Sequence, residues 1–393
     1  MVDQRRFEKP AGFRDYPPPL AEKKRALEEK IRKAFCRWGY QEVLTPTLEY
    51  FETVGEASVI EEERIFKLID REGKTLALRP DQTAPIARVV STSLGDAPLP
   101  LRLFYQTNVF RAQEERMGRD AEFFQSGVEL IGEPTPEGDA EVIALAVEVL
   151  QICKIPSFRL VVGHVGLLHD LLQETVGESQ MIQKLKQALR ERDNVGYRQL
   201  VQEAKLSTNH RAFLLSLLSP KEQFSLLEGI QDKFHSSEIE QSVAYLRALW
   251  EALQDYGVSN NVTFDPLLTG SLSYYTGVYF EGYANALGFP LLSGGRYDRL
   301  MERFGRSAGA TGFAIKIDRL MEVCLHIPCK TRRIAILFSQ KKRKEAITKA
   351  MRLRKQGLEV VLQPIDRRNK LSEVWKSSFT QWIELREEEG DEK

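Results

Sequence analysis

The sequence has few cysteines and no long hydrophobic run. Its 393 residues include only 4 cysteines, which are too few for a disulfide framework and are typical of a reducing compartment. The longest apolar stretches, such as residues 143–149, are much shorter than the roughly 18 residues that a membrane-spanning helix requires. The first residues do not resemble a signal peptide. We therefore predict a cytoplasmic protein that does not enter a membrane.

The sequence also lacks a net charge. Its 56 lysines and arginines balance 56 aspartates and glutamates, so no overall positive field attracts nucleic acid. A local basic run at residues 341–344 lies close to acidic residues, which favours a solvated helix face over an RNA-binding surface. Nucleic acid is therefore not an expected partner.

Motifs of several common enzyme classes are missing. The sequence has no Walker phosphate loop, no Gly-x-Gly-x-x-Gly, no His-Glu-x-x-His and no Gly-x-Ser-x-Gly. These absences argue against ordinary nucleotide folds, metalloproteases and serine hydrolases. Cys324, His326 and Cys329 place three potential zinc ligands close together, but no fourth ligand lies nearby and the spacing fits no common zinc site. We predict no metal site.

Hydrophobic periodicity predicts an α+β fold. Residues 20–39 have the spacing of an amphipathic helix that ends at a glycine. Residues 101–110 and 122–130 resemble two long strands, joined by a polar flap at 112–121. A further strand is expected at 289–292. Strands of this kind, with helices between them, indicate an antiparallel sheet flanked by helices.

The same periodicity predicts three regions. Leucines recur at helical spacing between residues 167 and 256, without any strand pattern. We therefore expect a mixed domain over residues 1–166 and 257–328, interrupted by an all-helical insertion at 167–256. Residues 329–393 are expected to form a small, truncated α/β unit with a strand, a basic helix and a second strand, followed by a frayed tail.

Two segments carry charged side chains suited to a ligand. Asp81 and Thr83 follow a strand, where they could hold an ammonium group, although Asp81 could equally cap the next helix. Further along, the strand alternation places Phe123, Gln125, Gly127 and Glu129 on one face. Arg111 and Arg119 flank the flap beside this face and suit a phosphate or carboxylate. A solvated hairpin with weak salt bridges is the alternative.

A third segment combines tyrosines with paired glycines. Tyr274 and Tyr275 precede one strand, and Gly294, Gly295 and Tyr297 follow another. Paired glycines allow close approach to the backbone, and tyrosine offers an apolar wall with a polar tip. These residues could enclose a small polar ligand. Alternatively, the tyrosines belong to the core and the glycines form a tight turn.

Together these segments resemble the catalytic domain of histidyl-tRNA synthetases, a class II aminoacyl-tRNA synthetase family. The likeness runs in order from about residue 13 to residue 320, and residues 40–49, 110–129 and 312–320 resemble motifs 1, 2 and 3. The resemblance implies a six- or seven-stranded antiparallel sheet and a homodimer formed through motif 1.

The resemblance also implies roles for particular residues. Asp81, Thr83 and Gln125 match the residues that hold the α-ammonium of histidine. Glu129, Tyr275 and Tyr297 match the residues that surround the imidazole of histidine. Tyr274 belongs to the family's histidine-specific signature, like Tyr275. Arg111 and Arg119 match the phosphate-facing arginines of motif 2, and Arg319 matches the motif 3 arginine that packs on ATP.

Several departures from the family pattern argue against catalysis. The signature Arg-Gly-Leu-Asp-Tyr-Tyr-Thr corresponds here to residues 270–276, which lack the arginine and the aspartate. Loss of one fixed donor that stabilises developing charge typically costs two to three orders of magnitude in rate. Motif 2 has Gln113 and Ala121 in place of glutamate and arginine, and Lys316 replaces a glycine of motif 3. The 331–393 segment is too short for a complete anticodon-binding domain. We predict no catalytic residues.

A synthetase-like chain with an amino-acid pocket but without these groups resembles the family of regulatory subunits of ATP phosphoribosyltransferase. The resemblance implies a non-catalytic role in the first step of histidine biosynthesis. It also implies a short catalytic subunit as partner, a larger hetero-oligomer, histidine as allosteric effector and no cofactor. An active histidyl-tRNA synthetase and a stand-alone histidine sensor remain alternatives, and the effector could instead sit at the subunit interface.

Overall fold

The computed structural model describes residues 7–55, 60–112, 120–218, 223–270, 274–324, 333–365, 375 and 377–386. The chain forms two compact units, Met1–Ile327 and Pro328–Lys393. No helix among the described residues is long and apolar enough to cross a membrane. The candidate ligand-binding residues all belong to the first unit.

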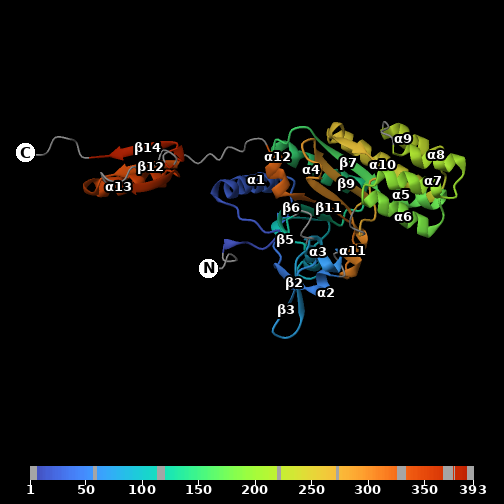
Figure 1. Cartoon of the computed structure of the whole chain (residues 1–393), viewed down its shortest axis with the longest axis horizontal. Helices are drawn as coiled ribbons and strands as arrows, with labels where there is room; N and C mark the ends of the chain where they lie inside the picture. The colour runs from blue at the N-terminus through green and yellow to red at the C-terminus, as the bar shows by residue number, and fades with distance from the viewer. Residues whose placement is uncertain are drawn as a thin grey trace, which may run out of the picture. The chain divides into compact units, whose positions relative to one another are not determined.

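A mixed sheet of eight strands forms the centre of the first unit (Figure 1). In spatial order the strands are β1 (Gln41–Glu42), β5 (Leu101–Phe110), β6 (Glu122–Ile131), β11 (Ala310–Lys316), β10 (Leu292–Arg296), β9 (Val278–Ala284), β7 (Phe158–His164) and β8 (Val262–Phe264). The six inner strands pair antiparallel, whereas β1 and β8 pair in parallel at the edges. The α+β class II synthetase-like fold is confirmed. The two edge strands have two and three residues and pair in parallel, so the sheet is mixed and has eight strands, whereas the resemblance implied six or seven antiparallel strands.

Helices α1 (Pro18–Arg37), α4 (Pro136–Ile152) and α12 (Ile317–Val323) cover one face of this sheet (Figure 1). Pro18 lies in the first turn of α1, where its missing N–H costs nothing. Leu27, Ile31 and Phe35, spaced four residues apart, are fully buried against the sheet. Just beyond the helix, Gly39 has a φ of 82° that suits a helix terminus.

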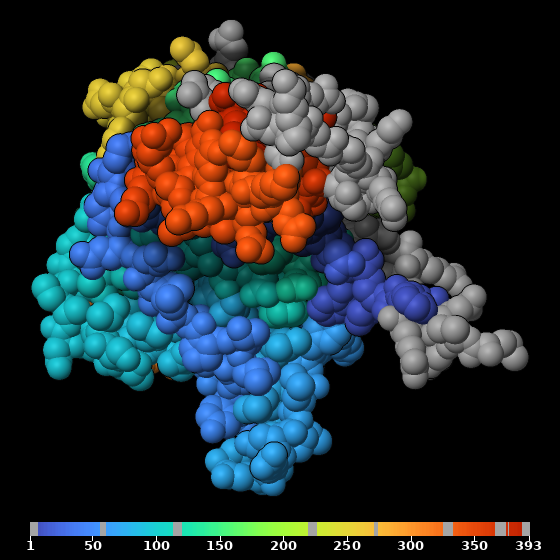
Figure 2. Space-filling model, turned by 90° about the vertical axis from the view of Figure 1, so that its left-hand side faces the viewer, coloured from blue at the N-terminus to red at the C-terminus, as the bar shows by residue number. Residues whose placement is uncertain are grey.

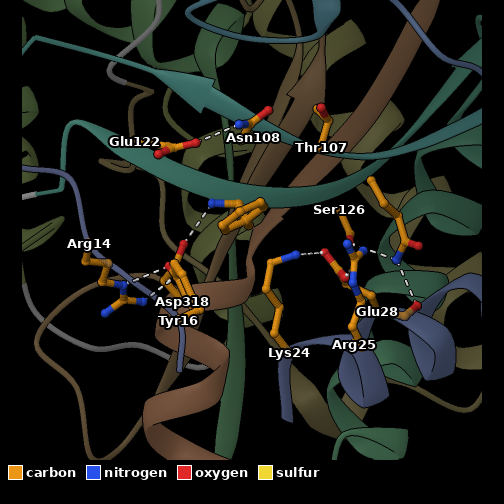
Figure 3. Close-up of polar contacts among 12 residues, drawn as sticks. Arg14, Tyr16, Lys24, Arg25, Glu28, Thr107, Asn108, Glu122, Ser126 and Asp318 are labelled. Carbon is orange, nitrogen blue, oxygen red and sulfur yellow. Dashed lines mark hydrogen bonds and ion pairs between the residues drawn. The ribbon is translucent and has the colours of Figure 1, made fainter. Parts of the chain in front are cut away.

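A polar layer lies between these helices and the sheet (Figure 3). Asp318 accepts hydrogen bonds from the Phe124 backbone N–H (2.8 Å), from Arg14 (2.5 Å) and from the Tyr16 hydroxyl. Nearby, the ammonium of Lys24 is 2.5 Å from Glu28 and 3.6 Å from the centre of the Phe124 ring. Asp318 therefore ties the N-terminal segment to β6 and α12.

The other face of the sheet carries smaller elements. A three-stranded antiparallel sheet has the order β2 (Leu48–Tyr50), β4 (Thr75–Leu78) and β3 (Lys67–Ile69). Around it lie α2 (Phe51–Val54), η2 (Glu62–Arg64), α3 (Thr83–Ser91) and α11 (Asp298–Arg303). Ile86 and Val90 pack with Leu300 and Met301 in a second core on this side. The hairpin of β3 and β4 projects from the body of the unit (Figure 2).

Helices dominate residues 165–255. They are α5 (Val165–Thr175), α6 (Ser179–Arg190), α7 (Asn194–Glu203), α8 (Thr208–Ser216), α9 (Gln223–Gln231) and α10 (Ser237–Asp255), followed by η4 (Ser259–Asn261). They gather at one end of the first unit (Figure 1). Tyr245 of α10 donates to Asp139 of α4 (2.8 Å), and Arg296 of β10 pairs with the same carboxylate (3.0 Å). The buried ion pair of Asp139 and Arg296 joins α4 to the sheet, and the hydrogen bond from Tyr245 connects α10 to this pair.

The second unit is a three-stranded parallel sheet with one helix. Its order is β13 (Glu359–Pro364), β12 (Arg333–Phe338) and β14 (Gln381–Leu385), with η5 (Gln340–Lys342) and α13 (Arg343–Lys355) after β12. A tail was expected after the second strand, but β14 pairs with β12 over Ile334–Phe338. Its five residues are mostly exposed and include two charged or amide side chains, so the sequence pattern did not indicate a strand.

Candidate ligand pocket

Missing side chains create space on the sheet face opposite α1. Gly312 of β11 pairs with Glu129 of β6, and a Cβ at Gly312 would lie 2.1 Å from the Glu129 carboxylate. A Cβ at Gly127 would lie 2.5 Å from the Tyr105 hydroxyl. Only glycine therefore allows Glu129 and Tyr105 to occupy these positions. The alternative of a tight turn at Gly294 is wrong, because this glycine lies inside β10.

The Leu78–Thr83 segment enters this space between β4 and α3. The buried guanidinium of Arg79 donates to the carbonyls of Thr45 (2.8 Å) and Asn108 (2.9 Å) and so fixes the segment. Asp81 Oδ1 accepts the Ala84 N–H at 3.3 Å, as the capping alternative predicts. The other oxygen, Oδ2, is buried and has no hydrogen-bond partner within the described structure. One carboxylate thus caps α3 and leaves an oxygen for a ligand.

Burial changes the protonation of both central carboxyl groups. It raises the pKa of Asp81 from 3.8 to about 6, against the opposing effect of Arg111. It raises the pKa of Glu129 from 4.5 to about 8, although Glu129 accepts hydrogen bonds from the Tyr297 hydroxyl and from Thr83 (3.1 Å). Near neutral pH, Asp81 is mainly ionised, whereas Glu129 keeps its proton in much of the population.

The pocket has a volume of about 130 Å³. Cavities of about 150 Å³ admit benzene, so the size suits a small molecule with one ring. Eight of the sequence-predicted site residues line it: Asp81, Thr83, Arg111, Gln125, Glu129, Tyr274, Tyr275 and Tyr297. The ring of Tyr274 lies 4.8 Å from that of Tyr275 and 5.7 Å from that of Tyr297. The structure therefore brings acidic and aromatic side chains together.

Two predicted arginines are not placed in the pocket. Arg319 donates to the carbonyl of Pro290 (2.6 Å), and its guanidinium lies 5.1 Å from the centre of the Phe289 ring. Arg119 lies outside the described residues, as do His326 and Cys329. Cys324 is buried and donates to the Cys153 carbonyl (2.9 Å). Among the described residues no cluster of metal-ligating side chains occurs.

Three further pocket residues were not predicted. Tyr105 lies on β5 opposite Gly127, and Tyr279 and Glu281 lie on β9. Glu281 accepts hydrogen bonds from Tyr279 (2.7 Å) and from Arg192 of the helical region (2.7 Å). Alternation along β9 could have indicated that Tyr279 and Glu281 share a face. The register that brings this face to the pocket could not be read from the sequence.

Cations lie at the same site. Lys316, in place of the family's glycine, pairs with Gln125 in register and places its ammonium 5.3 Å from the centre of the Phe123 ring. The guanidinium of Arg111 lies 5.5 Å from the same ring and donates to the Pro80 carbonyl (2.8 Å). The pocket offers carboxylates and cations together, which suits a small zwitterion better than a polyphosphate.

Comparison with known protein families shows which class of protein this fold belongs to. The family described as "Histidyl-tRNA synthetase" matches residues 12–320, so the chain has the histidyl-tRNA synthetase architecture around an amino-acid-sized pocket. The C-terminal unit matches the family described as "Histidyl-tRNA synthetase HisZ, C-terminal domain" over residues 335–366.

Individual relatives narrow this class. The ATP phosphoribosyltransferase regulatory subunit of Halalkalibacterium halodurans is 45% identical over 361 residues, 91% of each chain. That of Bacillus subtilis is 43% identical over 388 residues, 98% of each chain. A crystal structure from Bacillus halodurans, titled as a regulatory subunit/histidyl-tRNA synthetase, has a TM-score of 0.89 at 42% identity and covers 97% of this chain and 98% of its own. The chain belongs to the family of ATP phosphoribosyltransferase regulatory subunits, which are non-catalytic subunits of histidine biosynthesis.

Proposed function

We propose that the pocket binds histidine, and that histidine binding to this chain lowers the activity of a short ATP phosphoribosyltransferase catalytic subunit. The observation that carries the proposal is the buried Asp81 Oδ2, which has no partner within the described structure. A buried charged acceptor without a donor is costly, and an ammonium group would satisfy it with a charge-assisted hydrogen bond.

The remaining groups fit the rest of a histidine molecule. Gln125 and Thr83 line the same pocket as Asp81, and we propose that they complete the set for an α-ammonium. Arg111 uses its Nε on the Pro80 carbonyl, and we propose that its terminal nitrogens bind the carboxylate of histidine. We further propose that the imidazole ring lies among the tyrosines that line the pocket, where Glu129 exchanges hydrogen bonds with its nitrogens. A molecule with only one of these three groups would leave polar atoms of the pocket unsatisfied.

Regulation requires more than binding. Histidine must bind one conformation of the complex more tightly than another, because equal affinity shifts no equilibrium. We propose that the flap at 112–121 and the glycine-rich strands are the parts that respond. Residues 113–119 of this flap lie outside the described structure. Its ends are fixed by hydrogen bonds from Ala112 to the Arg64 carbonyl (2.9 Å) and from Ala121 to the Gly12 carbonyl (2.7 Å).

We propose that the chain forms a homodimer through the motif 1 region within a larger hetero-oligomer. The projecting sheet, whose outline Figure 2 shows, and the segment before it carry exposed apolar side chains. They are Leu44, Leu48, Tyr50, Leu68 and Ile69, with Leu44 and Ile69 nearly 80% exposed. Apolar groups in such numbers are typical of an interface. Ile69→Glu should halve the mass in light scattering, whereas Arg71→Glu on the same hairpin should not. Unchanged mass for Ile69→Glu would exclude this surface.

The function is tested by reconstitution. The purified chain and a cognate short catalytic subunit are mixed, and phosphoribosyl-ATP formation is measured with and without histidine. We expect activity only with both chains, and inhibition by histidine. Asp81→Asn should keep the stimulation and lose most of the inhibition, while Asp232→Asn on an exposed helix end serves as control.

Three outcomes would contradict the proposal. No stimulation by the wild-type chain would remove the regulatory role. Undiminished inhibition with Asp81→Asn would move the effector to another site, such as the subunit interface. Histidine-dependent ATP–pyrophosphate exchange by the chain alone would indicate an active synthetase.

A further inference from the structure

A second cavity of about 320 Å³ lies on the other side of the two pocket tyrosines. Tyr274 and Tyr275 line both cavities. The second cavity opens between the helical region and the sheet, and its lining comes from α5, α6, α11 and the segment before β9: Val165, Gly166, His169, Lys186, Tyr274, Tyr275, Thr276, Arg299, Leu300 and Arg303.

The two cavities differ in their charged side chains. Carboxylic residues (Asp81, Glu129 and Glu281) and cations (Arg111 and Lys316) line the first together, whereas the described residues that line the second include no carboxylate. The second cavity has Lys186, Arg299, Arg303 and His169 instead. Arg299 and Arg303 are four residues apart on α11 and therefore lie on the same side of the helix. Cations from two separate parts of the fold thus converge on one space.

Two of these side chains, Lys186 and Arg299, are not neutralised by a carboxylate in the described structure. Within the part of the chain that the structure describes, neither Lys186 nor Arg299 forms an ion pair. The Lys186 ammonium lies 2.9 Å from His169 Nδ1. An ammonium can only donate, so His169 accepts at Nδ1 and keeps its second ring nitrogen as a donor. The carboxylate of Asp170, which interacts electrostatically with His169 and Lys186, does not line the cavity.

The surroundings of Lys186 favour an added negative charge. Burial lowers its pKa, and neighbouring Arg190 lowers it further. A bound anion would offset both effects.

We propose that this cavity is a binding site for a phosphate-bearing small molecule, held by Lys186, Arg299, Arg303 and His169. Guanidinium groups bind phosphate oxygens through two parallel hydrogen bonds, and a lysine adds a point charge. The cavity is more than twice as large as the histidine pocket, which leaves room for a sugar or nucleoside beside the phosphate. The exposed positions of His169, Arg299 and Arg303 allow such a ligand to enter and leave.

The experiment is calorimetric titration of the full chain with inorganic pyrophosphate at low salt. The double variant Lys186→Gln/Arg299→Gln should weaken binding at least tenfold. Lys184→Gln, on the exposed side of the same helix, is the matched control and should change affinity less than twofold. A second control, Lys344→Gln/Lys349→Gln, removes charges from the basic surface of α13. Thermal melting of each variant verifies that it is folded.

Each outcome decides the proposal. Absence of pyrophosphate binding at millimolar concentration, or equal binding by the double variant, would overturn it. Loss of binding only in the α13 variant would place the anion site in the other unit and would also overturn it. So would binding of an acidic peptide but not of pyrophosphate, which would indicate a protein partner. Parallel titrations with ATP and ribose 5-phosphate identify the ligand: tighter binding of ATP than of pyrophosphate supports a nucleotide, and tighter binding of ribose 5-phosphate supports a phosphorylated sugar.

Discussion

Asp81 and Asp318 are two almost equally buried carboxylates, with 5% and 4% of their surface exposed, on opposite sides of the same sheet. Asp318 accepts three hydrogen bonds, from the segment before α1 and from β6 (Figure 3). Asp81 accepts one long backbone hydrogen bond, and its second oxygen has no partner in the described structure. Burial alone therefore does not distinguish a carboxylate that stabilises the fold from one that is suited to bind a ligand. The number of hydrogen-bond donors around the carboxylate distinguishes them.

The largest effect on stability is expected at Asp318, whose carboxylate accepts three hydrogen bonds. Asp318→Ala removes the acceptor of three part-buried donors, the Phe124 N–H, the Tyr16 hydroxyl and Arg14, all of which stay in place. We expect a loss of about 3–4 kcal/mol in the free energy of unfolding, measured by urea denaturation. Asp15→Ala, an exposed neighbour of the same segment, should cost less than about 0.5 kcal/mol. A similar small loss for Asp318→Ala would refute the anchoring role.

At Asp81 and Glu129, in the pocket, the expected effect on stability depends on pH. The folded pKa values of Asp81 and Glu129, about 6 and about 8, exceed their ordinary values of 3.8 and 4.5. The folded state therefore holds these protons more tightly, and its advantage at low pH is lost as the pH rises from about 4 to 8. For Asp81 alone the change corresponds to roughly 3 kcal/mol.

The measurement is the difference in unfolding free energy between the wild type and Asp81→Asn/Glu129→Gln, without histidine, at several pH values. The variant should gain on the wild type as the pH rises. A difference that stays constant between pH 4 and 8 would contradict the assigned pKa values.

At neutral pH, replacing Asp81 should change the free energy of unfolding in a different direction from replacing Asp318. Asp81→Asn removes an incompletely satisfied buried charge while keeping the shape and one acceptor. We expect no loss of stability and a gain of up to about 1 kcal/mol without histidine, measured by urea denaturation. A loss comparable to that of Asp318→Ala would mean that Asp81 is chiefly a structural residue.

The smallest effect is expected from Tyr297→Phe. The substitution removes one hydrogen bond to Glu129 and keeps the ring in the pocket wall. We expect histidine affinity to fall about threefold to tenfold, because one hydrogen bond contributes about 1 kcal/mol. Calorimetric titration measures it, with Tyr256→Phe, far from the pocket lining, as control. Unchanged affinity would place the imidazole away from Glu129.

Local patterns in the sequence predicted the pocket face of β6 and the helix that covers the opposite face of the sheet. Alternation along residues 122–131 placed Gln125, Gly127 and Glu129 on one face, and β6 in the structure has Gln125 and Glu129 in the pocket. The helical spacing of Leu27, Ile31 and Phe35 likewise predicted the covering helix. Such features depend on residues a few positions apart.

The remaining features depend on partners far away in the chain. Tyr105 and Glu281 join the pocket only through the registers of β5 with β6 and of β9 with β10. The sequence left a tight turn as one alternative for Gly294 and Gly295, because glycine pairs are common in turns. Both lie inside β10, where Gly294 permits close packing against β11 and Gly295 permits close packing against β9. The hydrogen-bonding role of Asp318 was not predicted, since its donors lie about 300 and 194 residues away.

The place of β11 in the sheet has a consequence for folding and synthesis. β11 inserts between β6 and β10, although the entire helical region separates it from β6 in the chain. Contacts across such a long loop form late, whereas helices with local contacts form early. On the ribosome, Asp81 and Glu129 emerge well before Tyr297 and Gly312. Until residue 316 has left the exit tunnel, a nascent chain has two acidic groups and no pocket around them, so a ligand of this pocket can bind only to the finished unit.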